Sequence, residues 1–556
     1  MNRMNYQKYR PFPPIDLPNR KWPSNTIKKA PAWCSVDLRD GNQALEKPMT
    51  LDQKIRFFKF LVNMGFKEIE VGFPAASDTE YIFTRTLIEK NLIPDDVTIQ
   101  VLTQSREHII RKTFEALDGV KKAIVHLYNS TSTLQREVVF GKDKKEITAL
   151  AVFGAKLIDD LADKYGKERF LFEYSPESFT GTELDYAAEI CNAVIDVWKP
   201  TADRKTIINL PSTVEMATPN VYADQIEYMC NNLKYRENIS VSLHAHNDRG
   251  CAVAATELGI LAGADRVEGT LFGNGERTGN ADIMNIALNM FTQGIDPELD
   301  FTDINKAISI YEESTEMPVH PRHPYAGSLV YTAFSGSHQD AIKKGMAKMK
   351  EHPDRWEVPY LPIDPVDVGR NYDPIIRINS QSGKGGVAYI LENNYGLVVP
   401  RAIQQDFGKI VTKYSDENNK ELEPEEIKEL FFDTYVNISE PVKLIYFNEL
   451  NSGTDTATIS VDMEINGEAK KLSGSGAGII EAFCNALNEV VTDHIYEIVN
   501  YSEHSLDYGN KSKAITYIQI YDDKQNPYFG AGVSSGVSKS SLRAVVSAVN
   551  KMLTSK

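Results

Sequence analysis

The strongest constraint on the fold is a regular alternation of strand-like and helix-like segments that starts near residue 32. Short runs rich in β-branched and aromatic residues predict eight strands, at 32–38, 67–73, 97–102, 122–128, 169–175, 205–210, 239–246 and 265–273. Apolar residues at helical spacing predict helices between and after these strands, among them 51–64, 78–90, 146–165, 182–198, 218–233, 250–262 and 280–292. Eight strand–helix units predict an α/β fold, a (β/α)8 TIM barrel over residues 32–315. A doubly wound open sheet is the weaker alternative, because no Gly-rich phosphate-binding turn follows the first strand.

Segments outside the barrel need cores of their own, since 556 residues are too many for a single one. Residues 1–31 are rich in proline and predict an N-terminal arm that lies on the main domain. Residues 316–433 break the alternation and predict small linker subdomains, with helices at 338–350 and 423–433. The Gly-rich segment 380–391 predicts a turn rather than a nucleotide site, because no strand and helix flank it in P-loop order.

An internal repeat predicts a separate C-terminal α+β domain over residues 434–556. Residues 456–490 resemble residues 513–552, and each copy predicts two strands, a Gly-rich turn and an amphipathic helix. Two such ββα units can bury each other's apolar faces. The predicted turns contain Gly474-Ser475-Gly476 and Gly530-Ala531-Gly532. A helix N-terminus after such a turn can hold a carboxylate, which favours a small-ligand site; tight strand-to-helix turns without a ligand are the alternative.

The composition excludes several classes of partner. A formal net charge of −16 argues against nucleic acid and against an anionic membrane. No apolar run is long enough to span a bilayer, and the first residues lack the apolar core of a secretion signal. The five cysteines are scattered and odd in number, which is typical of a reduced, cytoplasmic protein.

The clearest candidate ligands are two histidines at the end of the predicted seventh strand. His244 and His246 are two residues apart, so both imidazoles point to the same face. Active sites of (β/α)8 barrels lie at this end of the strands. Asp40 follows the first strand and Asn280 follows the eighth, which is its neighbour in a closed barrel. These oxygen and nitrogen donors suit a divalent cation with open water positions, Mg2+ first and Mn2+ or Zn2+ as alternatives. Two hydrogen-bonded histidines without a metal are the simpler reading of the pair.

Open metal positions can chelate a substrate that offers adjacent oxygens, such as a 2-oxo acid, and the metal then polarises the keto oxygen. Arg39 precedes Asp40 and is placed to stabilise a developing oxyanion. An ion pair between Arg39 and Glu70 is the structural alternative, and the two roles are compatible.

Four separated motifs resemble the 2-isopropylmalate synthase family of metal-dependent barrel enzymes. They are LRDGNQAL (38–45), LPSTVE (210–215), SLHAHNDRG (242–250) and GNGERTGNADI (273–283). Segments 172–183, 320–342 and 365–389 are similar to the longer form of these enzymes. The resemblance covers roughly residues 20–500, and the C-terminal repeat resembles a leucine-binding regulatory domain.

The resemblance implies an acyltransferase that condenses acetyl-CoA with 3-methyl-2-oxobutanoate and hydrolyses the thioester. The products are 2-isopropylmalate and CoA, in the first committed step of leucine synthesis, with leucine as inhibitor. It implies metal ligation by Asp40, His244 and His246, with Asn280 nearby or ligating. It also implies a keto-acid pocket formed by Arg39, His126, Ser175, Asn209 and Thr213.

For proton transfer, the resemblance points to Glu177 or His338 as the base for the acetyl methyl group, with Tyr372 in support. In the family the last two reach the partner subunit's barrel, which implies a homodimer. The leucine site would involve Gly530, Ala531 and Gly532.

Several related functions remain as alternatives. Homocitrate and citramalate synthases share the metal motifs but take another 2-oxo acid. A lyase would run the same bond change backwards, although such lyases usually lack the C-terminal repeat. A leucine sensor on an inactive barrel is the alternative outside enzymology, and the intact Asp40, His244 and His246 argue against it.

Overall fold

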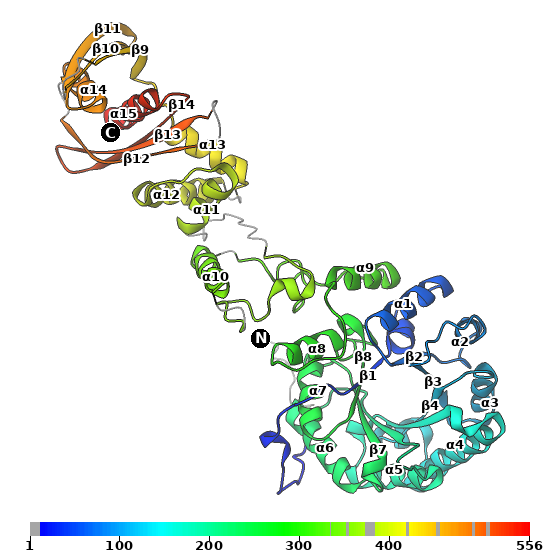
Figure 1. Cartoon of the computed structure of the whole chain (residues 1–556). Helices are drawn as coiled ribbons and strands as arrows, with labels where there is room; N and C mark the ends of the chain where they lie inside the picture. The colour runs from blue at the N-terminus through cyan, green and yellow to red at the C-terminus, as the bar shows by residue number, and fades with distance from the viewer. Residues whose placement is uncertain are drawn as a thin grey trace. The chain divides into compact units, whose positions relative to one another are not determined.

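The predicted barrel is present as a closed ring of eight parallel strands (Figure 1). The computed structural model describes residues 12–333, 335–351, 355–372, 384–418, 422–451, 456–491, 495–506 and 512–555. The barrel strands are β1 (Ala32–Ser35), β2 (Glu68–Gly72), β3 (Thr98–Gln104), β4 (Ala123–Ser130), β5 (Phe170–Glu177), β6 (Thr206–Ser212), β7 (Ile239–Ala245) and β8 (Arg266–Gly269). Their order runs consecutively from β1 to β8, and β8 pairs with β1 to close the ring. The prediction of a TIM barrel is therefore confirmed.

Helices surround the strands on the outside of the barrel (Figure 1). They are α1 (Leu51–Asn63), α2 (Asp78–Glu89), α3 (Glu107–Ala116), α4 (Lys144–Tyr165), α5 (Leu184–Trp198), α6 (Pro219–Asn232), α7 (Ala252–Leu261) and α8 (Ile283–Phe291), followed by α9 (Ile304–Thr315). Local sequence explains their starts: Thr50 with Gln53, and Asp143 with Glu146, form reciprocal caps at the N-termini of α1 and α4. The buried face of α1 includes Phe57 and Phe58, which are part of the core.

The register of the ring brings the polar strand ends to one rim. His126 of β4 lies beside Glu173 of β5, and Ser130 lies beside Glu177. On the other side of the ring, His244 of β7 lies beside Glu268 of β8, which lies beside Cys34 of β1. Because parallel neighbours keep their direction, side chains from distant parts of the sequence line one central space.

The chain divides into two compact units. The first contains residues 1–330 and 363–371, and the second contains residues 331–362 and 372–556. Within the first unit, the N-terminal arm is tied to α6: Trp22 Nε1 donates to Asp224 at 2.7 Å, and Glu227 accepts from the backbone of Trp22 at 2.8 Å. No helix among the described residues combines the length and the apolarity that a bilayer span requires.

The second unit begins with helices and ends with two sheets. Its helices before the sheets are α10 (Gly336–Met349), α11 (Lys384–Tyr395), α12 (Arg401–Asn418) and α13 (Pro424–Tyr435). The predicted helices at 338–350 and 423–433 are confirmed as α10 and α13. The predicted turn at 380–391 is wrong from Lys384 onward, where α11 begins, and its first residues lie outside the described ones.

The C-terminal repeat is confirmed, with one more strand in each copy than predicted. The first copy contains β9 (Val442–Asn451), β10 (Ala457–Ile465), β11 (Glu468–Gly476) and α14 (Ile479–Asn488). The second contains β12 (Tyr496–Ser505), β13 (Ala514–Asp522), β14 (Pro527–Ser534) and α15 (Val537–Thr554). Each copy forms a three-stranded antiparallel sheet. One core joins the two copies, with Ile459 and Phe483 from the first and Ile518 and Val545 from the second.

The prediction that Gly530, Ala531 and Gly532 form a turn before a helix is wrong. All three lie inside β14, and α15 begins only at Val537. A Cβ atom on Gly532 would lie 2.0 Å from the carbonyl oxygen of Ser540 and 2.6 Å from the backbone nitrogen of Ala544. The glycines therefore let α15 pack directly on the strand. The position of a leucine site in this domain stays a prediction.

We predict that Gly532→Ala destabilises the C-terminal domain by about 1–3 kcal/mol, because the added methyl group overlaps helix backbone that has no room to move. The matched control is Gly536→Ala, where nothing lies within 4 Å of the new Cβ and the backbone is extended. Calorimetric unfolding of the full chain measures both. Equal melting temperatures for the two variants would contradict this account of the glycines.

Candidate active site

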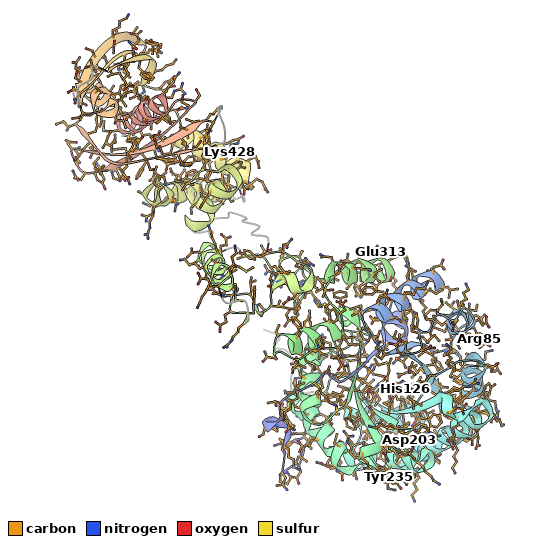
Figure 2. The ribbon with its side chains drawn as sticks, in the orientation of Figure 1. Arg85, His126, Asp203, Tyr235, Glu313 and Lys428 are labelled. Carbon is orange, nitrogen blue, oxygen red and sulfur yellow. The ribbon has the colours of Figure 1, made fainter. Side chains whose placement is uncertain are left out.

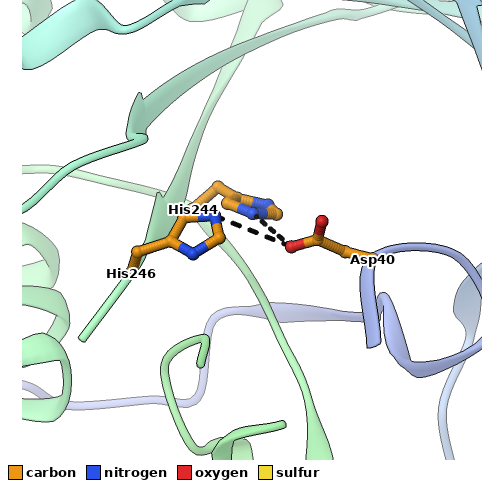
Figure 3. Close-up of side chains that lie close together, drawn as sticks. All are labelled: Asp40, His244 and His246. Atoms are coloured by element: carbon orange, nitrogen blue, oxygen red, sulfur yellow. Dashed lines mark ion pairs between the residues drawn. The ribbon is translucent and has the colours of Figure 1, made fainter. Parts of the chain in front are cut away.

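Three predicted ligands converge at the rim of the barrel (Figure 3). Asp40 lies in η3 (Asp37–Gly41), a short π-helical turn after β1, while His244 lies in β7 and His246 directly follows the last residue of that strand. Asp40 Oδ2 is 3.3 Å from His244 Nε2 and 3.7 Å from His246 Nε2. One ligand atom from each residue lies within 4.8 Å of the other two, and all three side chains are buried. This geometry matches a site for one divalent cation.

Unpaired oxygen atoms at the same place support this interpretation. Among the described residues, Asp40 Oδ2 and Asn280 Oδ1 are buried without a hydrogen-bond partner. Asn280 pairs through its backbone with His246, and its amide nitrogen donates to the carbonyl of Asn274 at 2.9 Å, so the unpaired atom is the oxygen. Buried polar atoms normally have partners. A cation held by imidazole nitrogens and by these oxygens would supply them.

The site keeps its ligands in unequal protonation states. Burial lowers the pKa of His244, but the neighbouring carboxylates of Asp40 and Glu268 outweigh that effect and raise the pKa to about 9. Burial and the neighbouring His244 lower the pKa of His246 to about 4. Burial disfavours the charge of Asp40, yet Arg39, followed by His244, holds the pKa of that carboxyl well below its ordinary range. When no cation is bound, His244 therefore carries a proton on each ring nitrogen near neutral pH, and His246 is neutral.

Arg39 is held by two carboxylates. Its Nε atom donates to Glu70 Oε2 at 2.5 Å, and its Nη1 atom donates to Asp40 Oδ1 at 2.9 Å. The predicted ion pair with Glu70 is thus confirmed. Arg39 also lines the central cavity, so its guanidinium is fixed in orientation where a negatively charged oxygen would sit.

A second wall of the site is a chain of polar side chains from β4, β5 and β6. His126 Nδ1 lies 2.8 Å from Glu70 Oε1, and His126 Nε2 lies 2.7 Å from Ser175 Oγ. Ser175 Oγ also accepts from Asn209 Nδ2 at 3.0 Å. Because a carboxylate only accepts, His126 donates from Nδ1 to Glu70. Figure 2 shows His126 among the strands in the middle of the barrel.

These groups surround one cavity of about 230 Å³. Nine of the predicted site residues line it: Arg39, Asp40, His126, Ser175, Glu177, Asn209, Thr213, His244 and His246. The remaining lining is Gln43, Phe73, Leu102, Tyr128, Pro211, Glu276 and Arg277. Tyr128 and Glu276 add polar groups to it, while Phe73, Leu102 and Pro211 contribute apolar surface.

Two predicted residues belong to the second compact unit. His338 lies in α10, where its ring stacks on Tyr360 with centroids 4.0 Å apart. Tyr372 is the last described residue of the segment 355–372. Each is described within its own unit, so their role at the barrel stays a prediction.

Sequence reasoning missed a buried layer of charged and polar side chains beneath the ligands. Glu268, Arg266, Gln100 and Glu173 lie inside the barrel, fully buried or nearly so. Charged residues inside strands are the signal that could have found them, since such residues are rarely buried without a partner. His126, Glu173 and Glu268 also lie close enough to share a cation. Arg266 already occupies that place, 2.9 Å from Glu268 and 3.6 Å from Glu173.

Comparison with known proteins gives consistent results along the chain. Residues 30–310 match the HMGL-like family, residues 328–392 match the alpha-isopropylmalate synthase post-catalytic domain-like family, and residues 421–553 match the LeuA allosteric (dimerisation) domain. A 2-isopropylmalate synthase of Acetoanaerobium sticklandii is 65% identical over 99% of this chain and 97% of its own length. Proteins of the same name from Clostridium acetobutylicum and Agrobacterium fabrum are 57% and 56% identical, over 99% and 98% of both chains.

We predict that Mn2+ binding releases about one proton, because the metal must displace the proton of His244, whose pKa is about 9. His246, with a pKa of about 4, is already neutral near pH 7 and releases none. The affinity for Mn2+ should therefore rise about tenfold per pH unit between about pH 6 and 8. Titration calorimetry in buffers of different ionisation enthalpy counts the protons.

The control for this titration is His244→Ala, which removes one ligand and the bound proton together. This variant should bind Mn2+ far more weakly and without proton release. A wild-type affinity that does not change with pH would contradict the assignment of the proton to His244.

Proposed function

The chain belongs to the family of 2-isopropylmalate synthases, and from that premise we propose how its residues carry out the reaction. The enzyme is an acyltransferase: it condenses acetyl-CoA with 3-methyl-2-oxobutanoate and hydrolyses the thioester, which gives 2-isopropylmalate and CoA. The observation that carries the assignment is the identity of up to 65% over the full chain, together with the convergence of Asp40, His244 and His246 at the barrel rim.

Asp40, His244 and His246 hold the divalent cation in this proposal, with Asn280 Oδ1 as a further ligand or as a neighbour. Mg2+ is the first candidate and Mn2+ or Zn2+ the alternatives, because the donors are mixed oxygen and nitrogen atoms without a thiolate. When bound, the cation supplies a Lewis acid for the keto group of the substrate. Three protein side chains would leave open positions on such a cation for oxygen atoms of the substrate.

The keto acid is bound by side chains of four barrel elements. Arg39 faces the keto or carboxylate oxygens, since Glu70 and Asp40 fix its guanidinium. Ser175 and Asn209 offer hydrogen bonds on the opposite wall, where His126 orients the serine. Thr213 completes the polar lining. The branched alkyl chain then packs on apolar lining residues, for which Phe73, Leu102 and Pro211 are the candidates.

Glu177 is our first choice as the base that removes a proton from the acetyl methyl group. It lies at the end of β5, lines the cavity, and accepts a hydrogen bond from Ser130 Oγ. A thioester methyl group is a weak acid, so a positioned base is required. His338 and Tyr372 act in this proposal from the second unit, supplied by the other subunit of a homodimer.

Regulation is assigned to the C-terminal region, which matches the LeuA allosteric (dimerisation) domain. We propose that leucine binds this domain as an inhibitor. The expected location is the cytoplasm, because all five cysteines are free. Acetyl-CoA, the keto acid and leucine are the expected small-molecule partners.

Measuring CoA release with a thiol reagent tests the substrate assignment. With acetyl-CoA and Mg2+ present, kcat/KM for 3-methyl-2-oxobutanoate should exceed that for pyruvate and for 2-oxoglutarate by about tenfold or more, because each lost methyl contact and each misplaced carboxylate weakens binding. Leucine added to the same assay should lower the rate, with isoleucine as the control. A best rate with pyruvate would identify a citramalate synthase, and a best rate with 2-oxoglutarate a homocitrate synthase.

We predict that Glu177→Gln lowers kcat by about 10²–10⁴-fold, the range that a general base contributes, with an unchanged affinity for Mn2+. The amide keeps the size of the side chain and its contact with Ser130, but it cannot take up a proton. His338→Gln is the parallel variant. If only the His338 variant loses turnover, the base is His338, and Glu177 serves only to bind substrate.

A further inference from the structure

We propose that Glu268 is a positioning residue that holds the metal ligand His244 and the substrate-pocket residue Asn209 through a single carboxylate oxygen. This inference rests on the proposed metal site and names a further part of it. Glu268 lies on β8, in register with His244 on β7, and its side chain is fully buried. It does not line the cavity, so it acts through its neighbours.

The contacts of Glu268 divide between its two oxygens. Oε2 lies 2.8 Å from His244 Nδ1 and accepts from Asn209 Nδ2 at 3.1 Å. Oε1 accepts from Arg266 Nη1 at 2.9 Å and from Gln100 Nε2 at 2.8 Å. Four donors therefore saturate the carboxylate, which leaves it no freedom to rotate. A buried carboxylate of this kind is stable only because it is fully paired.

The groups beneath Glu268 fix it in turn. Arg266 Nη2 donates to Gln100 Oε1 at 2.7 Å, and Arg266 Nε donates to Glu68 at 2.6 Å. Arg266 Nη1 also donates to Ser242 Oγ at 2.8 Å. Hydrogen bonds thus connect Glu68, through Arg266 and Glu268, to the proposed metal ligand His244. Such hydrogen-bonded neighbours of a metal ligand fix the orientation of its side chain.

For His244, this contact determines which nitrogen faces the metal. A carboxylate accepts only, so Nδ1 carries its proton toward Glu268. Nε2, which lies 3.3 Å from Asp40 Oδ2, is therefore the nitrogen that would give up its proton and face the cation. His246 has no such support: its Nδ1 has no hydrogen-bond partner among the described residues. Of the two histidines, His244 is therefore the one whose ring is already oriented before a cation binds.

Glu268 also orients a side chain of the proposed substrate pocket, Asn209. The amide nitrogen of Asn209 donates both to Glu268 Oε2 at 3.1 Å and to Ser175 Oγ at 3.0 Å. Ser175 in turn contacts His126 Nε2. Removal of the Glu268 carboxylate would release the metal ligand and loosen this wall of the keto-acid pocket together.

The test compares Glu268→Gln with Glu173→Gln in the full-length protein. Glutamine has one acceptor oxygen, so its amide NH2 must face either His244 and Asn209 or Arg266 and Gln100, all of which donate. Glu173 is the matched control for the metal site: it is equally buried, and it lies 3.4 Å from His126 and 3.6 Å from Arg266 rather than against His244. Titration calorimetry with Mn2+ alone measures the affinity, and circular dichroism verifies the fold.

We expect Glu268→Gln to weaken Mn2+ binding about 10- to 100-fold, the usual cost of losing such a partner, while Glu173→Gln stays within about twofold of wild type. At saturating Mn2+, the KM for 3-methyl-2-oxobutanoate should also rise in Glu268→Gln. If Glu268→Gln does not fold, Glu268→Asp replaces it, because the shorter side chain keeps the charge but withdraws from His244.

Three results would overturn the inference: wild-type Mn2+ affinity in the folded Glu268 variant, an equal loss in Glu173→Gln, or a KM that does not change. The first two reject the role toward the metal, and the third rejects the role toward the substrate. Failure of the metal site itself gives a different result, since the wild-type protein would then not bind Mn2+ at these residues and His244→Ala would match it.

Discussion

Closure of the barrel between β8 and β1 is the constraint on which the site depends. Asp40 follows β1 and the histidines end β7, some 200 residues later, so only the pairing of Cys34 with Glu268 and of Glu268 with His244 brings them together. The same register places the Glu268 side chain under His244 and toward Asn209. A slip of one residue in β8 would turn Glu268 out of the barrel and remove the support of the ligand.

Charge compensation explains how such a centre can be buried. Arg39 pairs with Glu70 and Asp40 near the rim, and Arg266 pairs with Glu268 deeper in the barrel. Two arginines face more than two carboxylates there, so the interior keeps an excess of negative charge. A divalent cation at Asp40, His244 and His246 reduces that excess, and in its absence His244 holds a proton instead, as its raised pKa indicates. The positive charge at the proposed metal site and the buried carboxylates of the barrel therefore stabilise each other.

The C-terminal domain buries its apolar surface by packing the two copies of a repeat against each other. Each copy exposes an apolar sheet face that one helix cannot cover alone, and the two copies share a single core. Glycines inside β11 and β14 allow the helices to approach the strands at backbone distance. This domain therefore forms around its own packing, independently of the catalytic chemistry, as expected for a part that matches an allosteric domain rather than the barrel family.

The sequence by itself determined the barrel, the repeat and the identity of the polar strand ends, because hydrophobic periodicity and strand spacing are local properties. It also pointed to Asp40, His244 and His246, since residues two apart in a strand share a face. The sequence predicted a turn at Gly530, but this residue lies inside β14, where α15 packs directly against the strand. Only the tertiary structure shows this packing. It alone placed Glu268, Arg266 and Gln100 behind the ligands. The side chains that contact these three residues come from different strands. Which residues face one another depends on the register between strands, and the sequence of a single strand does not reveal that register.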